Sequence, residues 1–411
     1  MGLRFSWDWQ SAPEVRTAEL SATWSSLMIE VDDIVATLVE RRNDGHGIRK
    51  RLDLPTYPLA EWLTINWWVL NAPAHRPDQG SVDFAGAGSG FPWPDLTLRS
   101  DRSLMWAQVL QRDQDPDVVR FLTQGQTILD VEQSIGEIAE FIDATVRRLE
   151  ESGIHDTLLQ QEWSAIVDAD NDERDFCTVA AAWGFDPYDM PDVVVEQLLA
   201  AEKSIGDTAL TAELAGAIEF DAIDRAGQWV VAADRHVVVG GRAIPRLGSL
   251  VPPESRGRQQ PWRDGYRRAR EIRQLLGLAS TEWAPIDELI KVASVIDEPP
   301  SNVDALVRVT GESAGIVVGP HTNDASRRFA GARALARKVS EPRTGLSLLT
   351  RGKGYADRVE RAFAAEFLAP ADGLREILMG DYSDSAQQIA ADRLGVSPSV
   401  IEHQIDNQLA A

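Results

Sequence analysis

The chain has 411 residues, 44% of them hydrophobic and 26% charged, so it can bury sizeable cores and is too long for one ordinary domain. The formal net charge of -23 disfavours a nucleic-acid partner, and the single cysteine, Cys177, excludes an internal disulfide and a zinc cage of several thiolates. The sequence lacks a run of about 18 apolar residues and a basic-then-apolar N-terminal signal, so we expect a cytoplasmic protein without a membrane partner.

Residues 1–130 predict a β-rich N-terminal domain, because apolar and β-branched residues gather there in short stretches separated by Gly, Pro, Asn and Asp. The motif Asn43-Asp44-Gly45 is typical of a turn, and a helix is expected at Leu59–Leu70. A loop is expected at Ala72–Trp93. Strands are expected at Thr23–Val31, Ile34–Glu40, Ile48–Leu54, Leu96–Arg99, Leu104–Gln111, Val118–Thr123 and Thr127–Val131.

Residues 131–250 predict a helical middle domain. Their first apolar stripe has the helical period and consists of Ile135, Ile138, Phe141, Ile142, Val146 and Leu149. Further helices are expected at Asp156–Val167, Arg174–Trp183, Asp192–Ala201 and Asp207–Ile218. The segment His236–Val239 with Gly240-Gly241 has the pattern of a hairpin, and residues 251–261, rich in Pro, Arg, Ser and Gln, are the expected linker.

Residues 262–411 form the last expected domain and carry the most specific motifs. Strands are expected at Ala305–Val309 and Ala314–Val318, and helices at Arg327–Val339 and Asp357–Leu368. The first of these helices contains Arg-Arg-Phe-Ala-Gly-Ala-Arg-Ala-Leu-Ala-Arg, residues 327–337. The second continues into Phe-Ala-Ala-Glu-Phe-Leu-Ala-Pro, residues 363–370, and a final pair of helices is expected around Gly395.

These motifs resemble the ImmA/IrrE family of bacterial metallopeptidases, over roughly residues 262–409. The resemblance implies a zincin-like domain in which Arg327–Val339 is the zinc helix and Asp357–Leu368 carries the third zinc ligand. The expected fold class is therefore α+β, with a β-rich N-terminal domain, a helical middle region and a mostly helical, zincin-like C-terminal domain with a small sheet.

The zinc chemistry of such a helix needs two His residues four apart on one face, with a Glu after the first to activate water. Arg333, Ala334 and Arg337 stand at these positions, and Asp357 falls where the family places its carboxylate ligand. A guanidinium has no acceptor for a metal, and a methyl group cannot take a proton. We therefore expect no metal, no cofactor and no catalytic residue at this degenerate site.

Three interpretations of the replacements stay open. Asp357 can pair with Arg333 or Arg337 where zinc would lie, which requires side chains within about 4 Å. Alternatively, the site drifted after catalysis became dispensable, and both arginines face solvent. In the third interpretation the former cleft binds an anionic ligand or a carboxylate. The candidate cleft residues are Arg328, Arg333, Arg337 and Asp357.

Other constellations have ordinary structural explanations. No two of the six histidines have the spacing of a helical zinc pair, although His321 lies near the zinc helix in sequence. The segment Arg351-Gly352-Lys353-Gly354 lacks the spacing of a phosphate loop, and residues 386–408 are too acidic for a DNA-binding helix-turn-helix. Tryptophans at helical spacing favour a core over a stacking platform, and clustered arginines favour a solvated helix face. These sets are Trp62, Trp67 and Trp68, and Arg256, Arg258, Arg263, Arg267, Arg268 and Arg270.

The sequence favours a catalytically inactive pseudo-peptidase that binds a protein partner as a regulatory or sensor component. Active relatives of the resembled family cleave repressors, which suggests stress response, mobile-element control or phage defence. Two alternatives stay open. One is an enzyme with an unrecognised active site in residues 1–260, and the other is a nucleic-acid-binding transcriptional regulator, which the acidic charge disfavours.

Overall fold

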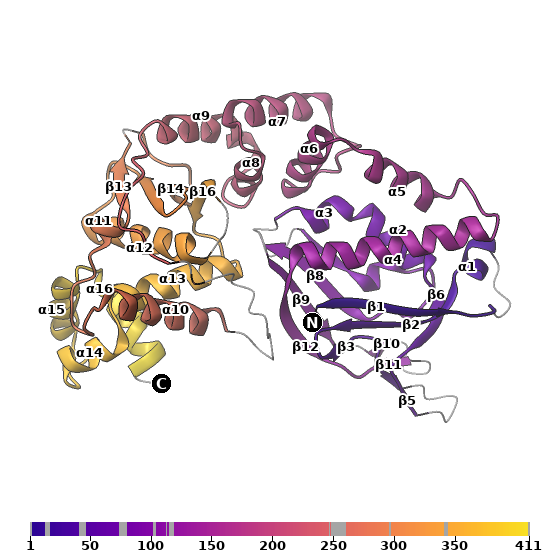
Figure 1. Ribbon diagram of the computed structural model, residues 1–411, viewed down its shortest axis with the longest axis horizontal. Helices are drawn as coiled ribbons and strands as arrows, with labels where there is room; N and C mark the ends of the chain where they lie inside the picture. Colours follow the sequence, from indigo (N-terminus) through magenta and orange to yellow (C-terminus); the bar gives the residue numbers. More distant parts are fainter. Residues whose placement is uncertain are drawn as a thin grey trace. The chain divides into compact units, whose positions relative to one another are not determined.

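The chain is an α+β protein that divides into two compact units (Figure 1). The computed structural model describes residues 2–12, 17–40, 47–73, 80–101, 104–111, 113–114, 119–245, 247, 260–295, 297–340 and 344–409. The N-terminal unit holds the described residues up to Met190, and the C-terminal unit holds those from Pro191 onward. Within these ranges, every helix falls short of the length and apolar character that a membrane crossing requires.

Antiparallel sheets make up the β-rich part of the N-terminal unit. One sheet contains β1 (Leu3–Trp9), β2 (Trp24–Val31), β3 (Ile34–Val35) and β6 (Leu52–Pro55). A second has the order β10 (Asp113–Gln114), β11 (Val119–Phe121), β4 (Val39–Glu40) and β5 (Ile48–Arg49). A third has the order β12 (Gly125–Asp130), β9 (Leu104–Leu110), β8 (Asp95–Asp101) and β7 (Ser81–Asp83).

The predicted strands are mostly present, with local differences. Residues of β2 are buried alternately, as the predicted strand Thr23–Val31 requires. The expected strand Ile34–Glu40 is interrupted between β3 and β4, where the Thr37 hydroxyl accepts the Ile29 N–H and donates to the Lys50 carbonyl. The expected loop Ala72–Trp93 contains β7, and β1 was not predicted. The expected turn at residues 43–45 lies outside the described residues.

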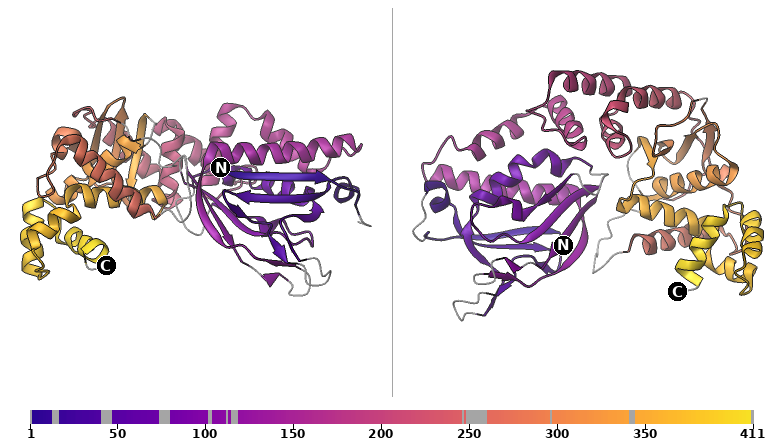
Figure 2. Two further views of the ribbon diagram at one scale, coloured as in Figure 1. Left: turned by 60° about the horizontal axis from the view of Figure 1, so that its bottom comes forward. Right: turned by 180° about the vertical axis from the view of Figure 1, so that it is seen from behind.

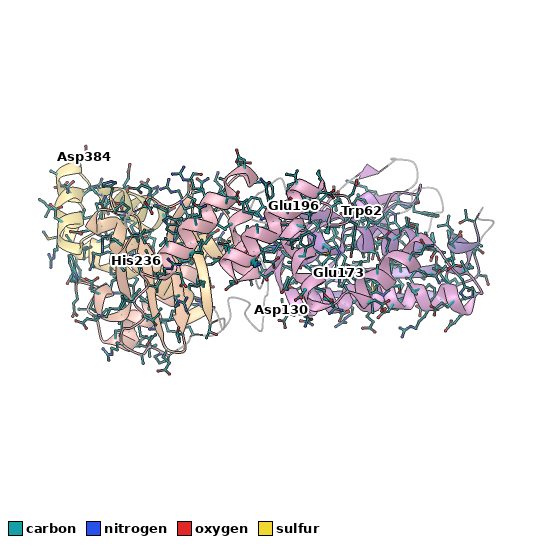
Figure 3. All side chains as sticks on the ribbon, turned by 90° about the horizontal axis from the view of Figure 1, so that it is seen from above. Trp62, Asp130, Glu173, Glu196, His236 and Asp384 are labelled. Carbon is teal, nitrogen blue, oxygen red and sulfur yellow. The ribbon has the colours of Figure 1, made fainter. Side chains whose placement is uncertain are left out.

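Helices cover the sheets of the N-terminal unit and contribute its aromatic core. They are α1 (Ala18–Ala22), α2 (Tyr57–Ile65), α3 (Trp67–Asn71), the 3₁₀ turn η1 (Phe84–Ala87), α4 (Val131–Glu151), α5 (Leu158–Asp168) and α6 (Asn171–Ala182). Asp130, which is labelled in Figure 3, caps α4. Its side chain accepts the Gln133 N–H. The predicted stripe of α4 is confirmed, because Phe141 stacks on Phe5 of β1 with ring centroids 4.5 Å apart. Figure 2 shows α4 running along β1.

The C-terminal unit combines one mixed sheet with helices. The sheet has the order β13 (Lys291–Ser294), β15 (Ser313–Val318), β14 (Val303–Thr310) and β16 (Gly345–Thr350), and only β13 runs parallel to its neighbour. The helices before the sheet are α7 (Asp192–Ile205), α8 (Thr208–Ala215), η2 (Phe220–Ala222), α9 (Ile223–Asp234), α10 (Pro261–Leu276) and α11 (Ile286–Leu289). The others are α12 (Asp324–Ser340), α13 (Tyr355–Leu368), α14 (Ala371–Leu378), α15 (Asp384–Leu394), α16 (Pro398–Gln404) and the π-helical turn η3 (Ile405–Leu409).

The helical residues 131–250 are shared between the two units. Helices α4, α5 and α6 belong to the N-terminal unit, because the stripe of α4 is buried against its sheet. Helices α7, α8 and α9 belong to the C-terminal unit, where Glu213 of α8 accepts the Leu348 N–H of β16 at 2.7 Å. The amphipathic pattern of a helix predicts that one face is buried, but it does not predict which part of the protein covers that face.

The expected hairpin at His236–Val239 was wrong. Gly240 pairs instead with Ala314 of β15 through reciprocal backbone hydrogen bonds of 3.3 Å. The chain passes so close to β15 that a Cβ atom at Gly315 would lie 2.1 Å from the Val238 carbonyl oxygen. The glycines of this region therefore permit backbone packing rather than a two-residue turn.

Candidate functional site

Helix α12, the predicted zinc helix, is buried on all sides over its second half. Every residue from Ala330 to Ser340 is buried, and the helix packs against α11, α13 and β15. Asn323 stabilises its beginning, since its side-chain oxygen accepts the Ser326 N–H at 2.8 Å. Charged side chains in the buried half must therefore find partners within the protein.

Arg333 lies in this buried half, with only 2% of its surface exposed. Its Nη1 donates to Asp304 Oδ2 of β14 at 2.8 Å, and its Nη2 donates to the Thr350 carbonyl of β16 at 2.8 Å. The same Nη2 lies 3.4 Å from Glu360 Oε2 of α13. One guanidinium thus links α12 to two strands and to α13.

Arg337 follows one turn later and is 3% exposed. Its Nε and Nη2 lie 2.9 and 2.8 Å from Glu360 Oε1, and its Nη1 donates to the Leu348 carbonyl at 2.8 Å. This contact with a single carboxylate oxygen is a short, charge-assisted interaction in a buried setting. Glu360, at 3% exposure, is therefore held by both arginines.

Asp357 is brought to the same place. Its Oδ1 lies 3.7 Å from Arg333 Nη2, within the distance that the ion-pair interpretation required. The interpretation with solvent-facing arginines was wrong, because both arginines are buried. Helix α13 presents Asp357 and Glu360 on one face, since they are three residues apart. We call these five side chains the ion cluster: Arg333, Arg337, Asp304, Asp357 and Glu360.

These residues do not fit a zinc ion. Both guanidinium groups are donors already directed at carboxylate and carbonyl oxygens, so neither offers a lone pair to a metal. Ala334, which stands where a general base is needed, is fully buried in the apolar core. Across the described part of the chain, no three His, Cys, Asp or Glu side chains gather as a metal site would require.

Arg328, the remaining candidate cleft residue, has another environment. Its guanidinium carbon lies 3.8 Å from the ring centroid of Trp283, and its nitrogens donate to the Gly395 and Ala284 carbonyls at 3.1 and 3.0 Å. Burial lowers the pKa of Arg328. The side chain therefore fastens the α15–α16 turn to the segment before α11.

A cavity of about 750 Å³ opens beside the ion cluster. Of the predicted site residues only Arg333 lines it, whereas Arg328, Arg337 and Asp357 do not. The wall combines apolar, polar and charged side chains, and it includes His321 and His403, which are far apart in the sequence. The principal residues are Tyr266, Glu298, Val303, Asp304, His321, Asn323, Ser326, Phe329, Arg333, Arg351, Arg361, Val400, His403 and Gln404.

Other sequence constellations are placed by ordinary contacts. Trp68 is buried, Trp62 donates to the Asp83 carbonyl at 2.8 Å, and Trp67 packs edge-on against Trp163. His236 lies at the end of α9 and bonds the Ala232 carbonyl (Figure 3).

Three arginines of the basic cluster in α10 are paired with acids. Arg267 and Arg268 both contact Asp264, and Arg270 Nε donates to Glu366 Oε1 at 2.7 Å. Arg256 and Arg258 lie outside the described residues. The segment Arg351-Gly352-Lys353-Gly354 connects β16 to α13. The backbone at Gly352 lies close to Asp357, because a Cβ atom added to this glycine would be 2.5 Å from Asp357 Oδ2.

No protein-family model matches this chain, and no curated protein matches its sequence. The assignment to a family therefore stays a prediction, and the α+β fold stands on the structure.

Proposed function

We propose that this chain is a catalytically inactive ImmA/IrrE-like pseudo-peptidase. It holds a protein segment in its former substrate cleft and acts as a regulatory or sensor component, in stress response, mobile-element control or phage defence. The observation that carries this proposal is the ion cluster, because three of its members, Arg333, Arg337 and Asp357, stand at the sequence positions that the resemblance assigns to metal ligands.

The cluster supports replacement of the metal rather than random loss. A buried guanidinium is strongly unfavourable unless it is paired and hydrogen-bonded. Arg333 and Arg337 have Asp304 and Glu360 as partners and two carbonyls of β16 as acceptors. The cluster thus joins α12, α13 and the sheet, as a metal would join the two helices.

The neighbouring cavity supports binding without cleavage. Its volume of about 750 Å³ falls in the range of ligand pockets, and its wall is partly apolar and partly polar. A bound peptide bond would meet no activated water at Ala334, because a methyl group cannot accept a proton. The cleft therefore retains a binding surface beside a helix that no longer carries the reactive groups.

Affinity capture from the native host tests this proposal. Ser326 is exposed and lines the cavity, so Ser326→Trp fills the cleft without disturbing the core. Ser385→Trp makes the same change on exposed α15, outside the cavity. We expect a stoichiometric, uncleaved protein partner with the wild type and with Ser385→Trp, and its loss with Ser326→Trp. A partner retained by Ser326→Trp, or a partner-free chain that turns over a metabolite or nucleic acid, would contradict the proposal.

A further inference from the structure

Arg361 of α13 lines the cavity beside the ion cluster. The side chain is half-buried, and its Nη2 donates to the Gly352 carbonyl. Burial, and then the like charge of Arg333, lower the pKa of Arg361, against the charges of Asp357, Glu360 and Asp304, which raise it. In the described part of the chain its guanidinium forms no ion pair within 4.0 Å, so it is a partly desolvated cation with unused donors beside an open cavity.

The wall around Arg361 carries charges of both signs. Arg333 and Arg351 share one carboxylate, since Arg333 Nη1 lies 2.8 Å from Asp304 Oδ2 and Arg351 Nε lies 3.0 Å from Asp304 Oδ1. Glu298 is the other acid in the wall, and it faces His321 at 3.8 Å. Asp357 and Glu360, which do not line the cavity, also act on the charge of Arg361, so four carboxylates balance Arg333, Arg337, Arg351 and Arg361 when the histidines are neutral.

The beginning of α12 adds to this field. Thr322, Asn323, Ala325 and Ser326 line the cavity, so the positive end of a 17-residue helix dipole is directed at the same space. The remaining wall combines apolar residues, among them Tyr266, Phe329 and Val400, with polar residues such as His403 and Gln404. The cavity thus offers apolar and polar contacts, and the donors of Arg361 and the beginning of α12 are available to a carboxylate.

We propose that the cleft selects peptide segments that carry a carboxylate, which the Arg361 guanidinium receives. This inference rests on the proposed peptide-binding function and names its specificity. A guanidinium matches the planar carboxylate through two parallel hydrogen bonds. A carboxylate brings one negative charge to the Arg361 guanidinium, whereas a phosphate ester carries about 1.5 to 2 negative charges at neutral pH and would meet the nearby carboxylates.

Fluorescence anisotropy of the full-length protein with labelled hexapeptides tests the selection. Several hexapeptides of arbitrary sequence are used, and each is made in three matched forms. The first contains one Glu and has an amidated C-terminus, the second has Gln in place of Glu and is also amidated, and the third is the Gln peptide with a free C-terminal carboxylate. We expect the wild type to bind a carboxylate form about tenfold more tightly than the amidated Gln form. The form that is preferred identifies a side chain or a C-terminus as the source of the carboxylate.

Three variants locate the selection at Arg361. Arg361→Gln should remove the preference while the affinity for the amidated Gln peptide stays within about twofold. Arg361→Lys keeps the charge without the planar fork and should retain part of the preference. Arg358→Gln, the same change at an exposed position of α13 outside the cavity, should behave as the wild type.

The outcomes separate the two proposals. Equal binding of all three peptide forms by the wild type, or a preference that survives Arg361→Gln, overturns the carboxylate selection and leaves the peptide-binding function standing. Failure of every peptide to bind overturns both.

Discussion

Replacing Arg337 by Met tests whether the ion cluster stabilises the C-terminal unit. The substitution keeps a long unbranched side chain in the core but removes the charge. Glu360 loses its two closest arginine contacts, at 2.8 and 2.9 Å, and the Leu348 carbonyl loses a donor at 2.8 Å. Glu360 is 3% exposed, so water cannot readily replace these contacts.

Removing one partner of a buried ion pair typically costs about 3 to 5 kcal/mol, because the other charge stays buried. We expect Arg337→Met to lower the free energy of unfolding of the C-terminal unit by this amount. Urea unfolding followed by hydrogen exchange mass spectrometry, read on peptides from α12 and α13, measures it. The double variant Arg337→Met/Glu360→Met should lose less than the two single variants added together, because it leaves no unpaired acid at this position.

Arg358→Met supplies the control, since it removes an exposed arginine from α13 and should change stability by less than about 0.5 kcal/mol. A loss of less than about 1 kcal/mol in Arg337→Met would refute the reasoning, because it would mean that the buried pair contributes no more than an exposed one.

Two further predictions concern packing and titration. Gly265→Ala should destabilise the C-terminal unit by about 1 to 3 kcal/mol, because the added Cβ atom would lie 2.5 Å from the Val359 carbonyl oxygen. The control Gly136→Ala, in α4, should be stabilising, because its Cβ atom would have no other atom within 4 Å. Thermal unfolding compares the two variants. Burial raises the pKa of Cys177 to about 11, above about 8.5 for a free thiol, so unfolding releases a proton between these pH values. The free energy of unfolding of the N-terminal unit should therefore fall by about 2 to 3 kcal/mol as pH rises from 8.5 to 11. The urea midpoint measured against pH should show this fall, and Cys177→Ala should flatten it. A slope that is unchanged or steeper in Cys177→Ala would contradict the prediction.

The sequence was sufficient for the local structure of the site. The sequence predicted the two helices, and the resemblance brought Asp357 to Arg333 and Arg337. One of the three open interpretations expected an ion pair there, and Asp357 Oδ1 lies 3.7 Å from Arg333 Nη2. Glu360 was missed, although its spacing of three residues from Asp357 places both acids on one face of α13.

Other partners depend on tertiary structure. Asp304 reaches Arg333 from β14, and the register of β14 with the unpredicted strand β16 sets its position. Among 64 acidic residues, no sequence spacing marks this one. Asp304 and Glu360 thus add two negative charges to the three charged residues that the sequence brought together, Arg333, Arg337 and Asp357.

Zinc titration of a restored site tests the central claim most directly, that the ion cluster stands where a peptidase metal site once lay. The variant Arg333→His, Ala334→Glu, Arg337→His and Glu360→Ala returns the two His ligands and the general base, keeps Asp357 and removes the extra acid. Calorimetry should show about one zinc ion bound per chain of this variant and none bound stoichiometrically by the wild type. A variant whose α12 and α13 are protected from hydrogen exchange as in the wild type, but which binds no zinc, would contradict the account.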